Sequence, residues 1–364
     1  MVDYNEQIKI LEDEIRNTQY NKATEHHIGL TKAKIATIRK KQEARSKGKG
    51  KTEGYAVRKT GDATAVLIGF PSVGKSTLLN ALTNAESKTA AYAFTTTTCI
   101  PGLLEYKKAK IQILDMPGII KGASRGAGRG REVFSVLRTA DLVIVIADVF
   151  EREQLDTIVK ELYDANMRLN QKKPNVRIRK LERGGIQIGK TVKLTKLEDE
   201  TIKGILNEFH TCNAQVLIRE DITPDQLIDV IEGDKKYVPM VLVVNKIDLA
   251  DEETLKSAKK YYKDAVFISA ENRTGIEEVK EAIFQKLDLM RIYLKEVGKE
   301  ADMEIPLIIK EGATIADVCD KLHRDFIKRF RFAKVWGKSA KFAAQRFNAT
   351  HALKDGDILQ IHLK

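Results

Sequence analysis

The chain has 364 residues, of which 43% are hydrophobic and 31% are charged. This length predicts two to four domains, and the hydrophobic content is sufficient for a sizeable buried core. No apolar run approaches the about 20 residues of a membrane-spanning helix, and the N-terminus lacks the apolar core of a signal peptide. The three cysteines are isolated, which argues against a disulfide framework or a zinc site. We therefore expect a monomeric cytoplasmic protein of several domains without a membrane partner.

The formal net charge of +12 is unevenly distributed. Residues 22–60 contain 12 Lys and Arg against 3 acidic residues, a net of +9. Residues 299–364 contain 13 against 9, a net of +4. Such concentrated charge favours a polyanionic partner, most simply nucleic acid, and a solvated surface without a partner is the alternative.

The N-terminal region predicts a basic helical segment followed by a linker. Residues 4–45 contain no proline and one glycine, and their isoleucine and leucine residues recur near helical spacing. We expect two helices here, with a helical hairpin as one possible arrangement. The sequence SKGKGKTEG at 46–54 is typical of a flexible linker.

From residue 61 the pattern becomes that of an α/β domain with a mostly parallel sheet. The apolar runs AVLIGF, IQIL, DLVIVIAD and PMVLVVN predict buried strands, and STLLNAL predicts a helix after the first of them. Strands that are apolar on both faces and alternate with helices are typical of such a sheet.

About 90 residues separate DLVIVIAD from PMVLVVN, far more than one crossover helix and its loops require. We therefore expect a small inserted α+β domain between these strands. Beyond residue 304, PLIIK, a helix from Ile315, KVW and DILQIHL predict a small α+β unit. The expected domains are a helical segment with its linker (1–60), an α/β domain in two parts (61–150 and 236–290), the insertion (151–235) and the C-terminal unit (291–364).

The sequence GFPSVGKS at 69–76 matches the phosphate-binding pattern G-x-x-x-x-G-K-[ST]. The match follows a predicted strand and opens a predicted helix, which is the context that identifies a P-loop. Backbone N–H groups of such a loop and of the helix N-terminus surround a β-phosphate. We expect Lys75 to contact the β- and γ-phosphates as a catalytic residue, and Ser76 to offer its hydroxyl to Mg²⁺. The other candidate nucleotide-binding residues of the loop are Gly69, Pro71, Ser72, Val73, Gly74 and Thr77.

Two further candidates follow the next predicted strand, in the sequence DMPG. Asp115 can hold Mg²⁺ through a water molecule. The backbone N–H of Gly118 can contact a γ-phosphate, which makes this glycine a candidate catalytic residue.

The sequence NKID ends another predicted strand and favours guanine over adenine. The carboxylate of Asp248 can accept hydrogen bonds from N1–H and the 2-amino group of guanine, and adenine has neither donor. Lys246 can lay its alkyl stem over the base, and Asn245 can tie the neighbouring loops together. The segment SAE, which contains Ser269 and Ala270, can offer a backbone N–H to guanine O6. These motifs occur in the order P-loop, DxPG, NKxD and SA.

Together the motifs resemble those of the DRG family, the developmentally regulated GTP-binding proteins among the Obg-like GTPases. The matching sequences are GFPSVGKSTLLN, YAFTTTT, DMPGIIKGASRGAGRGRE and NKID. The C-terminal unit resembles a TGS domain, a ubiquitin-like β-grasp fold, and the insertion lies where DRG proteins carry an extra domain. The resemblance covers nearly the whole chain. It implies a GTPase switch that binds GTP and GDP with Mg²⁺ as cofactor. The ribosome or RNA and a DRG-family regulatory protein are the implied partners.

The resemblance also implies two switch segments. In FTTTT (94–98) it makes Thr96 the catalytic, magnesium-binding threonine, although Thr95, Thr97 and Thr98 are alternatives from the residues alone. In the second segment Ile119 stands where many nucleotide-cleaving proteins have a glutamine that orients water. Because an isoleucine side chain cannot hydrogen bond to water, we expect slow intrinsic hydrolysis.

Several alternatives stay open from the sequence. Ser72 replaces a P-loop asparagine that coordinates potassium in some relatives, so a potassium requirement is open. The arginines at 125, 129 and 131 could stabilise transition-state charge, contact a partner or be solvated. An Obg-like ATPase is an alternative function that the intact NKID argues against. A GTP-binding scaffold with negligible turnover is the other alternative, and Ile119 is consistent with it.

The segment 330–347 interleaves aromatic residues with lysine and arginine, a mixture that suits RNA stacking. The aromatic residues are Phe330, Phe332, Trp336, Phe342 and Phe347. Packing in the core of the C-terminal unit explains many of them equally well.

Overall fold

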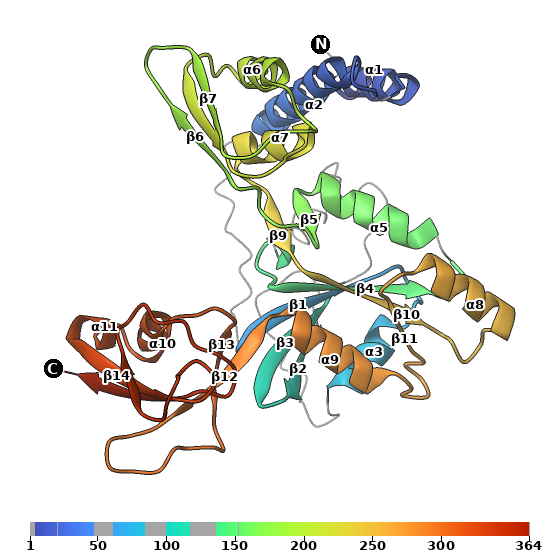
Figure 1. The fold of residues 1–364 in the computed structure, drawn as a ribbon. Coiled ribbons are helices and arrows are strands. Elements are labelled where there is room, and N and C mark those ends of the chain that lie inside the picture. Colours follow the sequence, from blue (N-terminus) through green and yellow to red (C-terminus); the bar gives the residue numbers. More distant parts are fainter. Residues whose placement is uncertain are drawn as a thin grey trace. The chain divides into compact units, whose positions relative to one another are not determined.

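The computed structural model describes residues 4–19, 21–46, 61–83, 100–116, 136–151 and 153–363. The chain divides into two compact units. One contains Met1–Gly54 and Gln171–Tyr237, and the other contains Tyr55–Asn170 and Val238–Lys364 (Figure 1). In these described ranges, none of the helices is both long and apolar enough to cross a membrane.

The second unit contains a six-stranded sheet in the order β11-β10-β4-β1-β3-β2 (Figure 1). Neighbouring strands are parallel from β11 to β3, and the edge strand β2 runs antiparallel to β3. The strands are β1 (Ala63–Ile68), β2 (Ile100–Tyr106), β3 (Ala109–Asp115), β4 (Leu142–Asp148), β10 (Met240–Asn245) and β11 (Val266–Phe267). Every residue of β1 and β4 is buried, which explains why their sequences are apolar without alternation. The expected mostly parallel sheet of an α/β domain is confirmed.

Helices cover both faces of this sheet, because successive side chains of a strand point to opposite faces. Leu67 packs in the apolar cluster that contains residues of α3 (Lys75–Leu82) and α9 (Ile276–Lys286). Its neighbour Val66 packs in the cluster that contains residues of α5 (Glu153–Asp164) and α8 (Glu252–Tyr261). The carboxyl ends of the parallel strands therefore lie along one edge between two helical layers, the usual position of a ligand site in such folds.

The same unit ends in a five-stranded sheet in the order β13-β12-β16-β14-β15. Strands β12 and β16 are parallel, and the other neighbours are antiparallel. Its elements are β12 (Leu289–Leu294), β13 (Leu307–Lys310), α10 (Ile315–Leu322), α11 (Phe326–Arg329), β14 (Phe330–Trp336), β15 (Gln345–Phe347) and β16 (Ile358–Leu363). Helix α10 packs on one face of the sheet through Ile315, Val318 and Cys319. A mixed sheet crossed by one helix agrees with the β-grasp fold expected for the C-terminal domain.

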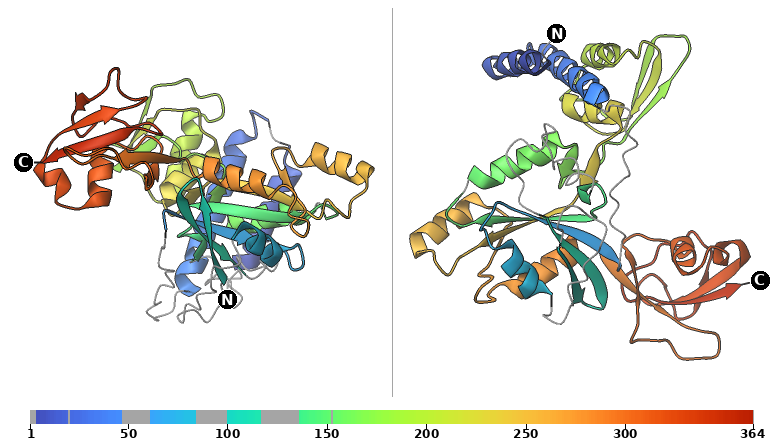
Figure 2. Two further views of the ribbon diagram at one scale, coloured as in Figure 1. Left: turned by 90° about the horizontal axis from the view of Figure 1, so that it is seen from below. Right: turned by 180° about the vertical axis from the view of Figure 1, so that it is seen from behind.

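The first unit joins the two N-terminal helices to residues of the insertion. Helices α1 (Tyr4–Asn17) and α2 (Glu25–Ser46) lie beside each other (Figure 2), and Arg39 of α2 pairs with Glu12 of α1 at 2.8 Å. The other elements are β6 (Val176–Lys180), β7 (Ile186–Lys190), α6 (Asp199–Glu208), β8 (Ala214–Ile218) and α7 (Pro224–Glu232). The strands form a sheet in the order β6-β8-β7. Helices α2 and α6 pack closely at Gly204, since a Cβ there would lie 2.7 Å from Leu30 Cδ2 and the leucine side chain would have to shift.

Two boundaries differ from those expected. Ala33 of α2 shares an apolar cluster with Ile202 and Leu206 of α6, so the N-terminal helices are not a segment of their own. Helix α5 packs on the central sheet through Ile158, so the insertion becomes a separate unit at residue 171 rather than 151. The last residues before the insertion, β5 (Met167–Leu169), pair with β9 (Lys236–Val238) in a two-stranded sheet. Helical periodicity identifies an apolar face but does not specify which element will cover it.

Candidate nucleotide-binding site

The loop at 69–76 connects β1 to the N-terminus of α3, as its sequence motif requires. Gly74 is the N-cap residue of α3 and has a left-handed backbone with a φ of 92°. A Cβ on Gly69 would lie 2.7 Å from the backbone oxygen of Ile146, so only glycine fits there without displacement of β4. The two glycines therefore allow a tight loop whose backbone can approach a ligand closely.

The side chain of Lys75 folds back over this loop. Its Nζ donates hydrogen bonds to the backbone oxygens of Gly69, at 3.2 Å, and Phe70, at 2.8 Å. Burial lowers the pKa of Lys75, and the charge of Asp115 opposes that shift. A phosphate group beside the ammonium would favour its charged form, and lysine is well suited to bind phosphate as a point charge.

Asp115 ends β3 next to the P-loop, since β3 is the parallel neighbour of β1 and Leu67 lies opposite Asp115. Its Oδ2 accepts a hydrogen bond of 3.1 Å from the hydroxyl of Ser76. Its Oδ1 is buried and has no hydrogen-bond partner among the residues that the structure describes. Burial raises the pKa of Asp115, whereas the Ser76 hydroxyl and the Lys75 charge lower it.

An unpartnered buried carboxylate oxygen normally costs stability, so this oxygen is suited to bind a cation or a water molecule. Carboxylate and hydroxyl oxygens are ligands that suit Mg²⁺, which usually keeps several of its waters. Ser76 and Asp115 therefore fit the metal that was expected at this position.

The side chain of Asn245 joins the P-loop to the loop after β11. Its Nδ2 donates to the backbone oxygen of Val73 and its Oδ1 accepts from the backbone N–H of Ala270, both at 2.9 Å. Asn245 is 4% exposed, so both bonds are shielded from water. The amide therefore sets the distance between the phosphate-binding loop and the candidate base-binding loop.

Lys246 forms an ion pair with a carboxylate that was not predicted as a site residue from the sequence. Its Nζ lies 2.7 Å from Asp148 Oδ2, and Oδ1 of the same carboxylate accepts from the N–H of Phe150 at 3.0 Å. Asp148 ends β4 directly opposite Asn245 in the parallel register. The available signal was an acidic residue that ends a buried strand, since site residues of α/β folds gather at strand carboxyl ends.

Asp248 lies in the turn after β10 and is exposed. In the neighbouring loop Ser269 is buried and its hydroxyl accepts from the N–H of Asn272 at 3.1 Å. The N–H of Ala270 donates to Asn245 and is thus engaged within the protein. Within the described chain the N–H of Glu271 has no partner, so it is able to donate a hydrogen bond to a ligand.

The structure thus brings most of the candidate residues to the carboxyl edge of the central sheet. These are Gly69, Pro71, Ser72, Val73, Gly74, Lys75, Ser76, Thr77, Asp115, Asn245, Lys246, Asp248, Ser269 and Ala270. Thr96, Gly118 and Ile119 lie outside the described residues. Their roles therefore stay predictions from the sequence.

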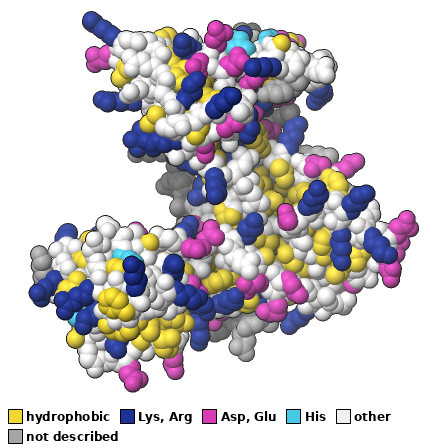
Figure 3. Space-filling view, in the orientation of Figure 1, with side chains coloured by type: hydrophobic (Ala, Val, Ile, Leu, Met, Phe, Trp, Pro, Cys, Tyr) yellow, Lys and Arg dark blue, Asp and Glu magenta, His cyan; other side chains and the backbone are white. Residues whose placement is uncertain are grey.

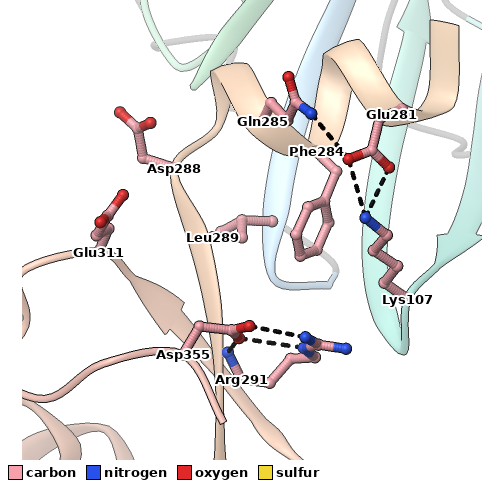
Figure 4. A pocket seen from close by; sticks show the side chains of 9 residues that line it. All are labelled: Lys107, Glu281, Phe284, Gln285, Asp288, Leu289, Arg291, Glu311 and Asp355. Atoms are coloured by element: carbon pink, nitrogen blue, oxygen red, sulfur yellow. Dashed lines mark hydrogen bonds and ion pairs between the residues drawn. The ribbon is translucent and has the colours of Figure 1, made fainter. Parts of the chain in front are cut away.

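A pocket of about 260 Å³ lies elsewhere in the second unit, where α9 meets β12 (Figure 4). Several of its polar side chains are paired with one another. Glu281 accepts hydrogen bonds from Lys107 and Gln285, each at 2.9 Å, and Arg291 Nη2 lies 2.7 Å from Asp355 Oδ2. None of the candidate nucleotide-binding residues lines this pocket, so we assign its contacts to the packing of α9 and β12 against their neighbours.

Sequence models of known families match successive parts of the chain. Residues 64–180 match a family described as "50S ribosome-binding GTPase". Residues 183–289 match the "C-terminal region of MMR_HSR1 domain", and residues 290–363 match the TGS domain.

Whole proteins of similar sequence match over almost their full lengths. An uncharacterized GTP-binding protein of Methanocaldococcus jannaschii is 53% identical over 99% of this chain and 93% of its own. An uncharacterized GTP-binding protein of Halobacterium salinarum is 45% identical, with 98% of each chain covered. Developmentally-regulated GTP-binding protein 2 of Bos taurus is also 45% identical, again with 98% of each chain covered.

Proposed function

Because the chain belongs to the family of developmentally regulated GTP-binding proteins, and so is a GTP-binding GTPase, we propose that it is a slow, magnesium-dependent switch that acts on ribosomes or other RNA. The observation that supports this most strongly is the juxtaposition of Lys75, Ser76 and the unpartnered oxygen of Asp115 at the P-loop. The amide of Asn245 connects this phosphate site to the loop expected to recognise the base.

The proposed roles follow from this geometry. Backbone N–H groups of the P-loop and the ammonium of Lys75 bind the phosphates, in place of the carbonyl contacts that Lys75 makes with its own loop. Ser76, Asp115 and Thr96 would hold Mg²⁺, which when bound neutralises negative charge on the β- and γ-phosphates. Asp248 reads guanine, and Lys246 covers the base with its alkyl stem.

The slow rate is inferred from Ile119, which cannot orient the attacking water. The scaffold with negligible turnover is the limiting case of the same argument. Help from an ion or a partner is part of the proposal, and potassium is the monovalent ion to test because Ser72 offers an oxygen in the P-loop. The backbone N–H of Gly118 would contact the γ-phosphate and report its presence to the following loop.

The proposed association with ribosomes or RNA is supported by charge and by the family description. Residues 22–60 carry a net charge of +9, and Lys34, Lys40 and Lys41 of α2 are exposed. Such a segment binds polyanions through release of their counterions. The family matched by residues 64–180 is described as ribosome-binding. A regulatory protein of the kind that serves DRG proteins is a further proposed partner of this cytoplasmic, monomeric switch.

Binding and turnover assays test these proposals separately. We expect fluorescent GTP and GDP to bind with Mg²⁺ present and ATP to bind far more weakly. We expect phosphate release to be slow and measurable, and to be abolished by Lys75→Ala. Its rate should be compared in potassium and in sodium. Equal affinity for ATP would favour the Obg-like ATPase. Tight GTP binding without phosphate release, also with ribosomes present, would favour the scaffold.

A further inference from the structure

The two faces of the C-terminal sheet differ in character, and β14 shows the difference. Ala333 and Val335 are fully buried and belong to the core beneath α10. Side chains alternate along a strand, so Phe332, Lys334 and Trp336 point away from that core, and they are partly exposed. We call the side that carries these three residues the outer face.

The two faces divide the aromatic residues of 330–347, whose roles the sequence left open. Phe330 and Phe347 pack against the core on the side of α10, and Phe330 departs from the alternation because the register of β14 shifts between Phe330 and Phe332. Phe332 and Trp336 lie on the outer face and are absent from that cluster. Phe342 is 66% exposed in the connection between β14 and β15. Core packing therefore accounts for the first pair and not for the outer-face residues.

Two aromatic rings of neighbouring strands stack on the outer face. Phe332 lies opposite His362 of β16 in the strand register. Their ring centroids are 4.4 Å apart and their planes differ by 17°. Burial and the charges of Lys334, Arg346 and Arg331 lower the pKa of His362, which favours the neutral form of the stacked ring.

Cations surround this stacked pair. The guanidinium carbon of Arg346 lies 4.7 Å from the centroid of the Phe332 ring, and that of Arg331 lies 5.8 Å from it. Lys295 extends the pattern, since its Nζ lies 5.2 Å from the centroid of the Trp336 ring. In Figure 3 the lobe of the C-terminal domain carries hydrophobic side chains bordered by lysines and arginines.

Two cations of the outer face are placed so that they destabilise the folded sheet. Lys334 and Arg346 lie directly opposite each other in the register of β14 and β15. Like charges in that arrangement destabilise a sheet. Across the described chain no carboxylate forms an ion pair with either residue. A polyanion bound to the outer face would attract both side chains and so offset the repulsion between them.

We propose that the outer face binds unpaired nucleotides of single-stranded RNA. A base extends the stack of Phe332 and His362, and Lys334 and Arg346 contact the flanking phosphates. Recognition of unpaired RNA by aromatic and basic side chains on an open sheet is a common solution, whereas a duplex hides the faces of its bases. The inference rests on the RNA association proposed above and assigns it a surface and a type of RNA.

The test uses the full chain and a fluorescent single-stranded RNA of about 12 nucleotides, with the same sequence as a duplex for comparison. Phe332→Ala should weaken binding of the single strand roughly 5- to 150-fold, which corresponds to the loss of about 1–3 kcal/mol when one base-stacking ring is removed. Phe332→Trp should retain the affinity. Phe342→Ala is the matched control, because it removes an exposed phenyl ring outside the sheet and should have no effect. GTP binding should be unchanged in all three variants.

A second pair of substitutions removes charge and leaves the rings in place. Lys334→Gln with Arg346→Gln should flatten the dependence of log affinity on log salt by about 1.4, since each phosphate contact with a single strand contributes about 0.7. This variant also covers the case in which Phe332→Ala fails to fold.

The outcomes separate this inference from the proposal on which it rests. If the wild-type chain binds the RNA and Phe332→Ala binds it equally well, the outer face is not the site, although RNA association stands. If polyglutamate displaces the RNA from wild type and from Phe332→Ala with equal ease, the surface recognises charge alone and the stacking is refuted. If the wild-type chain binds GTP but no RNA at low salt, both the inference and the proposed RNA association fail.

Discussion

Replacement of Asn245 by alanine should uncouple the phosphate-binding loop from the base-binding loop. In the wild-type chain this one amide bonds to Val73 and Ala270, both at 2.9 Å, from a position that is 4% exposed. Alanine removes both bonds and adds no new contact, so the carbonyl of Val73 and the N–H of Ala270 lose these hydrogen-bond partners.

The size of the effect follows from the two lost bonds. A hydrogen bond between uncharged groups contributes about 0.5–1.5 kcal/mol net, so two contribute about 1–3 kcal/mol. If the loops keep their positions until nucleotide binds, the whole cost falls on binding and the dissociation constant for GDP rises roughly 5- to 150-fold. If the loops instead loosen the free protein, the same cost appears as a fall in melting temperature of about 2–4 °C per kcal/mol.

Two measurements on one preparation distinguish these cases. Titration with a fluorescent GDP gives the affinity, and thermal unfolding without nucleotide gives the stability. Asn213→Ala is a matched control, because Asn213 also joins two backbone groups, accepting from Gly185 N–H at 2.8 Å and donating to Glu182 O at 3.3 Å. It lies in the other compact unit, so its loss should affect stability and leave GDP affinity unchanged. If Asn245→Ala changes neither GDP affinity nor melting temperature, the amide does not hold the two loops and the account of this site is wrong.

Three other predictions concern base choice, lysine position and a titration. Asp248→Asn should lose GTP affinity and gain XTP affinity by roughly ten- to a hundredfold, because charge-assisted hydrogen bonds are worth about 1.5–3 kcal/mol. Competition among GTP, XTP and ATP measures this change in base preference, and an unchanged preference for GTP would contradict the prediction. Asp148→Asn should weaken GDP binding about fivefold, because the ion pair at 2.7 Å that places Lys246 is lost from a partly exposed site; equal GDP titrations of variant and wild type would show that this carboxylate does not position the lysine. The hydrogen bond from Tyr106 to Glu281 is the main cause that raises the pKa of Tyr106 to about 12. The stabilisation that this hydrogen bond gives the folded protein is therefore present below pH 10 and is lost as the pH rises through 12. Absorbance titration of the phenolate should show the Tyr106 transition moving back toward 10 in Glu281→Gln, and an unmoved transition would exclude this hydrogen bond as the cause.

The parts of the protein that depend on neighbouring residues could be predicted from the sequence. The P-loop is one example, because a buried strand, a glycine-containing turn and a helix start lie within a single short segment. The mostly parallel sheet is another, since strands covered on both faces must be apolar throughout. The family resemblance has the same origin, and the full-length similarity to DRG proteins confirms it.

Other features depend on residues that only the folded chain brings together. The bond from Asn245 to the oxygen of Val73 spans 172 positions, and Asp148 reaches Lys246 because β4 and β10 are neighbours in a particular register. The sequence predicted that Asn245 could tie loops together, but neither its partners nor the role of Asp148 could be derived from it. The reason is that pairing of distant strands is set by the packing of the whole sheet.

Two elements show the same division. The spacing of isoleucines predicted a helix at α2, yet the tertiary structure decided that residues 171–237 cover one of its faces. In β14 the mixture of rings and cations was visible in the sequence. Alternation about Ala333 and Val335 then placed Phe332 and Lys334 on the face away from the core. Periodicity identifies which residues share a face, and only packing of the other elements determines whether that face is buried in a core or left for a partner.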